Sequence, residues 1–141
     1  GVLVGGGTEA DYMAKKDESS RRSWVGDKKS MNEAFTGALM SKLSENGMQG
    51  QFPGTPAPWV VFARVEFVEP GFYTYFVNQP SEVRMRVRIT SDKGVLVDEF
   101  IIRHSTPATI TSPASGNRLR SDAKTLGRFA AEYIMHRAAR N

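Results

Sequence analysis

Residues 83–103 read VRMRVRITSDKGVLVDEFIIR, and this stretch decides the fold. Apolar residues alternate with arginines over its first seven positions, which is the period of a strand with one buried and one exposed face. Residues 92–94 then supply a turn in which a glycine accepts a positive φ. A second β-rich run follows at 95–103, so the stretch predicts an antiparallel hairpin. The arginines expected on its outer face are Arg84, Arg86 and Arg88.

Three further segments complete the predicted fold. Residues 59–68 are rich in β-branched and aromatic side chains and predict a largely buried strand. A capping box of Ser30 with Glu33 predicts the start of one amphipathic helix, and apolar residues at helical spacing predict another over 121–140. The sequence therefore predicts an α+β fold, in which two amphipathic helices pack on a mainly antiparallel sheet of three to five strands.

The chain divides by composition into two parts. Residues 8–29 carry six basic and five acidic side chains with few apolar ones. We therefore expect residues 1–29 to form a charged, partly ordered N-terminal arm and residues 30–141 to form a single α+β domain.

Charge and cysteine content limit the possible functions. The net charge is +4, and the whole excess lies in residues 104–141, which carry six basic and two acidic side chains. Such a segment suits either a solvated helix face or contact with nucleic acid, anionic lipid or an acidic partner. The chain has no cysteine, which excludes a disulfide scaffold, a thiol nucleophile and a thiolate metal site.

The catalytic inventory is sparse. The two histidines, His104 and His136, are 32 residues apart and give no metal-ligand spacing, and no G-x-S-x-G nucleophile elbow is present. Asp98 and Glu99 are adjacent on a strand and point to opposite faces, so they cannot act together as acid and base. Gly5, Gly7 and Ala10 match a dinucleotide-binding spacing, but the expected strand, helix and second parallel strand do not follow. We expect no catalytic residue, no metal and no cofactor, and hence no enzyme.

The segment 72–76 is a candidate contact surface. It holds four aromatic side chains, and exposed rings can line a groove for a peptide, glycan, lipid or base. Alternatively, the rings cap the core of the domain. The candidate partner-binding residues are Phe72, Tyr73, Tyr75, Phe76, Arg84, Arg86 and Arg88.

The order of elements resembles the small α/β domains of bacterial envelope lipoproteins, such as PelC, LpoB and the amino-terminal domain of TolB. The resemblance covers roughly residues 31–140 and includes the hairpin with its Asp92-Lys93-Gly94 turn and the final helix with Leu126, Gly127 and Ala130. It implies a periplasmic or outer-membrane-associated protein that binds partners and has no catalytic residues. The lipidated cysteine of such proteins would lie upstream of Gly1.

Two hypotheses of function follow from these observations. The first is a non-enzymatic bacterial envelope (lipo)protein domain that acts by protein–protein contact, with another envelope protein or by self-association. A membrane is then approached only through an upstream anchor. The alternative is a cytosolic nucleic-acid-binding module that uses Arg84, Arg86, Arg88 and the basic C-terminal helix, and its affinity would fall steeply with salt. A small enzyme would require a polar pocket around His104.

Overall fold

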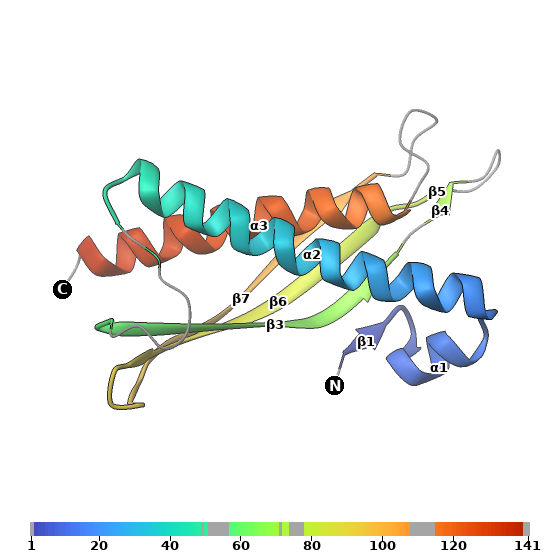
Figure 1. Ribbon diagram of the computed structural model, residues 1–141, viewed down its shortest axis with the longest axis horizontal. Helices are drawn as coiled ribbons and strands as arrows, with labels where there is room; N and C mark the ends of the chain where they lie inside the picture. Colours follow the sequence, from blue (N-terminus) through green and yellow to red (C-terminus); the bar gives the residue numbers. More distant parts are fainter. Residues whose placement is uncertain are drawn as a thin grey trace.

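The fold was analysed in a computed structural model that describes residues 2–48, 50, 57–70, 72–73, 78–107 and 115–139. It consists of three helices and seven strands within these ranges (Figure 1). In chain order, the elements are β1 (Leu3–Val4), β2 (Gly7–Thr8), α1 (Glu9–Ala14), α2 (Glu18–Glu45), β3 (Trp59–Glu69), β4 (Phe72–Tyr73), β5 (Asn78–Gln79), β6 (Ser81–Ser91), β7 (Leu96–Thr106) and α3 (Ser115–Ala139).

The main sheet has five strands in the order β2-β1-β3-β6-β7, and β4 and β5 form a separate pair. β3, β6 and β7 are antiparallel neighbours, each of 11 residues, and β1 joins β3 in parallel over two residues. The predicted hairpin is β6–β7, with Gly94 at φ 82° in its turn. The α+β class and the mainly antiparallel sheet are therefore confirmed, with three helices where the sequence predicts two.

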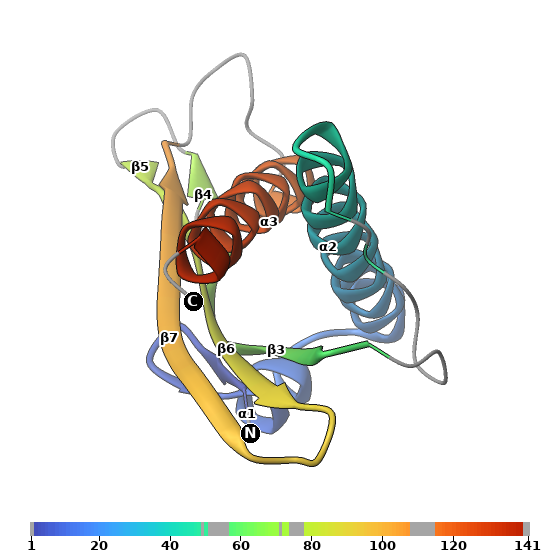
Figure 2. The same cartoon turned by 90° about the vertical axis from the view of Figure 1, so that its left-hand side faces the viewer.

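Both long helices lie on one face of the sheet (Figure 2). The core forms where α2, α3 and the inner face of β6 meet, and alternate residues of β6 from Ser81 to Ile89 are buried there. α2 and α3 cross closely at Gly127, because a Cβ at this position would overlap the carbonyl oxygen of Phe35. The apolar core residues of the two helices are Trp24, Met31, Phe35, Leu39 and Leu43 of α2, and Leu119, Ala123, Leu126, Ala130, Ala131 and Ile134 of α3.

The N-terminal segment differs from the sequence prediction. α2 begins at Glu18, twelve residues before the predicted start at Ser30, and Asp17 caps it by accepting a hydrogen bond of 2.8 Å from the backbone N–H of Ser20. Trp24 is 2% exposed and donates its indole N–H to Glu9 on α1. Residues 18–29 are thus helical, and Trp24 among them is part of the core, whereas Val25 is exposed.

β3 differs as well, because only one of its faces is covered. Its residues alternate between the helix side and the opposite side of the sheet, where Phe62 is 58% exposed and Val60 is 39% exposed. The prediction of a largely buried strand is therefore wrong. A β-branched run has the same composition whether one or both faces are covered, and here helices cover only one.

α3 begins at Ser115, six residues before the predicted start.

Within the described part of the chain, no helix combines the length and the hydropathy of a membrane span.

Candidate functional site

The outer face of the sheet, opposite the helices, holds the three arginines predicted from the alternation in β6. Register places Phe62 and Glu99 beside Arg88, and Arg64 and Ile101 beside Arg86. Because alternate residues of a strand point to opposite faces, the burial of Val83, Met85, Val87 and Ile89 holds these arginines outward.

Each of the three arginines lies against a glutamate. Arg84 Nε lies 2.6 Å from Glu82 Oε2, and Arg88 Nε lies 3.3 Å from Glu99 Oε2. Arg86 bridges two strands, because it donates to Glu66 at 2.7 Å and to Glu99 at 2.6 Å. The outer face therefore carries a ladder of mixed charge rather than a positive track.

Hydrogen bonds shift the pKa values of two groups in this ladder, Glu99 and Arg86. The bond from Arg86 is the main cause that lowers the pKa of Glu99, and the bond to Glu66 is the main cause that raises the pKa of Arg86. Both shifts favour the charged forms of Glu99 and Arg86.

Apolar side chains share this outer face with the ladder. Phe62, Ile101 and Leu3 are 58%, 51% and 51% exposed, and the guanidinium of Arg84 lies 4.4 Å from the centre of the Phe67 ring. Large apolar side chains half or more exposed beside ordered charges are typical of protein contact surfaces. We refer to Val60, Phe62, Ile101 and the Arg84–Arg86–Arg88 ladder as the outer-face surface.

The aromatic segment is only partly described. Phe72 and Tyr73 form β4, which pairs with β5, but their side chains lie outside the described part of the structure. Tyr75 and Phe76 lie outside the described residues altogether. All four rings therefore fall outside what the structure describes, and their role stays a prediction.

A buried polar cluster was not predicted from the sequence. The Asp122 carboxylate on α3 is fully buried and accepts hydrogen bonds from Ser81 Oγ at 2.7 Å and from Thr106 Oγ1. His104 Nδ1 lies 2.8 Å from Asp122 Oδ1. The only sequence signal for this cluster is an acid on the apolar stripe of α3, since Asp122 lies between Leu119 and Leu126 at helical spacing.

The order of contacts in this cluster does not match a hydrolytic triad. In a triad the imidazole lies between the hydroxyl and the carboxylate and removes the hydroxyl proton. Here the carboxylate of Asp122 lies between Ser81 and His104, and the serine donates to the acid. The cluster therefore ties α3 to the ends of β6 and β7, since a fully buried carboxylate needs several donors to be stable.

The opening glycines form a turn between two strands. Gly5 has φ 56° and donates its N–H to the carbonyl of Val68, and β2 follows directly. α1 then has six residues, with Thr8 and Asp11 as a capping box. A dinucleotide site requires a long helix at this point, which α1 does not provide. Among the described residues, no group of histidines and acids is arranged to hold a metal ion.

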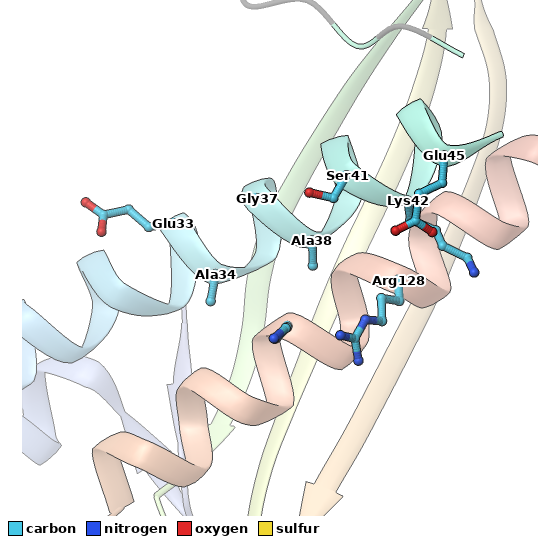
Figure 3. A pocket seen from close by; sticks show the side chains of 9 residues that line it. Glu33, Ala34, Gly37, Ala38, Ser41, Lys42, Glu45 and Arg128 are labelled. Carbon is cyan, nitrogen blue, oxygen red and sulfur yellow. The ribbon is translucent and has the colours of Figure 1, made fainter. Parts of the chain in front are cut away.

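A groove of about 600 Å³ lies between α2 and α3 on the side away from the sheet. Figure 3 shows that Ala34, Gly37 and Ala38 of α2 lie along it, with charged side chains of both helices at its rim. The charged residues that line it are Glu33, Lys42, Glu45, Lys124 and Arg128. These groups carry charges of both signs, and Ala38 lies at the helix crossing, against Gly127.

Comparisons with known proteins add little to this geometry. No family model matches the chain, and no curated protein matches it. The chain is similar to a crystal structure from Caulobacter crescentus CB15 described as a "putative lipoprotein". The TM-score is 0.48 at 20% identity, over 77% of this chain and 81% of that one. A likeness at this level carries no argument about function, and it does not relate the chain to PelC, LpoB or TolB in particular.

Proposed function

We propose that this chain is a non-enzymatic domain of a bacterial envelope protein that acts by binding another protein through the outer-face surface. The observation that carries the proposal is Phe62, which is 58% exposed on β3, opposite Arg88 of β6 and beside the arginine–glutamate ladder. Aromatic side chains on rigid elements supply large contact area at a low entropic cost, and ordered charges around them select the partner.

An envelope location is supported by the order of elements. The chain passes through a helix, a long strand, a hairpin and a final helix, which is the order on which the resemblance to envelope lipoprotein domains rests. We therefore propose a location in the periplasm or at the outer membrane, and fractionation of cells that express the native gene tests this proposal.

Site-specific photo-crosslinking in such cells tests the contact. A crosslinking residue replaces Phe62 in one strain and Val25 in another, because Val25 is equally exposed, at 56%, but lies on α2. We expect a defined cross-linked product at Phe62 that is absent at Val25. The same products at both positions, or none at Phe62, would refute the outer-face surface as the contact.

Nucleic-acid binding is less well supported by the geometry. Glu82, Glu66 and Glu99 offset the charge of Arg84, Arg86 and Arg88, so little free positive charge remains for phosphates on the outer face. The basic helix α3 lies on the opposite face of the sheet, so the two basic regions do not form one track (Figure 2). Fluorescence anisotropy with single- and double-stranded oligonucleotides decides between the two functions. Tight binding at low salt that is lost steeply as salt rises would favour the nucleic-acid module over the protein-contact domain.

A further inference from the structure

β7 forms an open edge of the main sheet. β6 pairs with it on one side, and no described strand pairs with it on the other. The strand has 11 residues and contains neither lysine nor proline, the residues that most often prevent sheet edges from pairing. An edge of this length presents a row of backbone donors and acceptors to another strand.

Exposed apolar side chains border this edge on both sides of the sheet. Ile101 projects from the outer face and is 51% exposed. On the helix side, Tyr133 stacks on Phe100 with ring centres 3.9 Å apart, and Phe129 lies edge-on to His104 at 6.1 Å. Tyr133 and Phe129 are 39% and 40% exposed, so the edge is apolar above and below its backbone.

We propose that β7 pairs antiparallel with β7 of a second copy, around a two-fold axis at Ile101. In this register the two Ile101 side chains face each other on the outer face. Glu99 of each copy lies opposite Arg103 of the other copy, so the dimer has two such pairs on that face. On the helix side, Phe100 lies opposite Ile102. The two main sheets then continue into one, and the same patch serves both copies, as two-fold symmetry requires.

Charge complementarity selects this register and this occupant. Backbone donors alternate along a strand, so a self-paired antiparallel ladder must be centred on a residue. If the axis lies at Phe100 or at Ile102, both Glu99 and Arg103 lie opposite uncharged side chains. Centring on Glu99 or Arg103 sets a charge against itself, which destabilises the pairing. The arrangement Glu99–Phe100–Ile101–Ile102–Arg103 is thus complementary to itself in one register.

The charged groups are also available for the contact. Arg103 is exposed and forms no ion pair with any residue that the structure describes. The Glu99 carboxylate contacts Arg86 and Arg88 in its own chain, but a carboxylate accepts about four hydrogen bonds. A second copy therefore supplies Arg103 with a partner and leaves the ladder in place.

Disulfide trapping tests the register in the full chain, which has no cysteine of its own. Opposed residues of an antiparallel pair have Cα atoms about 4.5–5.5 Å apart, within disulfide range. Ile101→Cys should therefore form a disulfide dimer under mild oxidation. Leu96→Cys is the control, because Leu96 is 55% exposed on the same strand, but its two copies would lie about 34 Å apart. We expect at least about tenfold slower cross-linking there.

Light scattering after size exclusion tests the association without a cross-link. We expect a mass of twice 15.6 kDa at high loading that falls towards 15.6 kDa over a roughly hundredfold dilution. Arg103→Glu sets like charges opposite each other and should raise the dimer Kd at least about tenfold. Arg64→Glu, a charge reversal on the outer face of β3, should leave the Kd unchanged.

The proposal is overturned by a wild-type chain that stays monomeric, by an Arg103→Glu Kd equal to that of the wild type, or by equal cross-linking at positions 101 and 96. If Arg103→Glu fails to fold, the comparison of cross-linking between Ile101→Cys and Leu96→Cys still tests the proposal. The inference shares Ile101 with the outer-face surface, but its test uses purified protein without a partner, so it and the proposed function can fail independently. Phe62→Lys should therefore leave the dimer intact.

Discussion

Gly127 is the point where α3 touches the backbone of α2, and replacing it with alanine should destabilise the domain. An added Cβ would overlap the carbonyl oxygen of Phe35 and lie 3.0 Å from Ala38 Cβ and 3.1 Å from the backbone nitrogen of Leu39. Two of these atoms belong to the backbone, so no change of side-chain rotamer removes the overlap. The helices must move apart, and the packing on both sides of the crossing loosens.

The size of the effect follows from two opposing contributions. Overpacking of a close-packed site costs about 1–3 kcal/mol, and a contact with rigid backbone places Gly127→Ala at the upper end of this range. Alanine recovers about 1 kcal/mol through its higher helix propensity. The free energy of unfolding should therefore fall by about 2 kcal/mol. At about 4 °C for each kcal/mol in a chain of this length, Tm should fall by about 8 °C.

Thermal and denaturant unfolding monitored by circular dichroism measure this change. Gly37→Ala is the matched control, because Gly37 lies on α2 with nothing within 4 Å of an added Cβ. The free energy of unfolding of Gly37→Ala should be up to about 1 kcal/mol higher than that of the wild type, and its Tm should be higher as well. If Gly127→Ala melts at or above the wild-type temperature, the close helix crossing is not present in solution.

Two further changes test the buried cluster and the N-terminal contact. Ser81→Ala removes one donor from the buried Asp122 carboxylate and should lower the free energy of unfolding by about 1–3 kcal/mol, whereas Ser121→Ala on the exposed face of α3 should have little effect. Equal denaturation midpoints for the two variants would contradict this role. The hydrogen bond from Lys28 is the main cause that lowers the pKa of Glu9 below 4.5 in the folded protein. The ionised Glu9 therefore stabilises the fold above pH 4.5, and this contribution is lost as the pH falls through the pKa of Glu9 in the folded state. Tm measured from neutral pH to about pH 3 should therefore fall less for Glu9→Gln than for the wild type, and parallel curves would exclude the contribution.

Local patterns predicted the elements whose signal is short-range. The alternation over residues 83–89 and the turn at 92–94 placed the hairpin, because both depend on neighbours within one or two residues. The start of α2 was missed because its first half exposes mostly charged side chains, and Trp24 lies seven residues before the next core residue of the helix, Met31. A single core residue in two turns gives too little periodicity to indicate a helix.

The candidate surfaces depend on longer-range relations. The outward direction of Arg86 could be predicted from alternation, but its bonds to Glu66 and Glu99 depend on the registers of two strand pairs. The cluster around Asp122 joins side chains that are 16 to 41 residues away in the chain, and no spacing rule relates them. Composition also could not tell which side of β3 the helices cover.

The acid on α3 also determines where that helix sits along the sheet. Small residues at Ala123, Ala130 and Ala131 line much of the buried side of α3. A slide by one turn, about 5.4 Å, would bring Ala123 or Ala131 to the place of Gly127, where a Cβ overlaps the carbonyl oxygen of Phe35. The same slide would carry the Asp122 carboxylate away from Ser81, Thr106 and His104, and a buried carboxylate without hydrogen-bond partners costs several kcal/mol. The carboxylate and the close contact at Gly127 therefore act together to fix one position of α3 along the sheet.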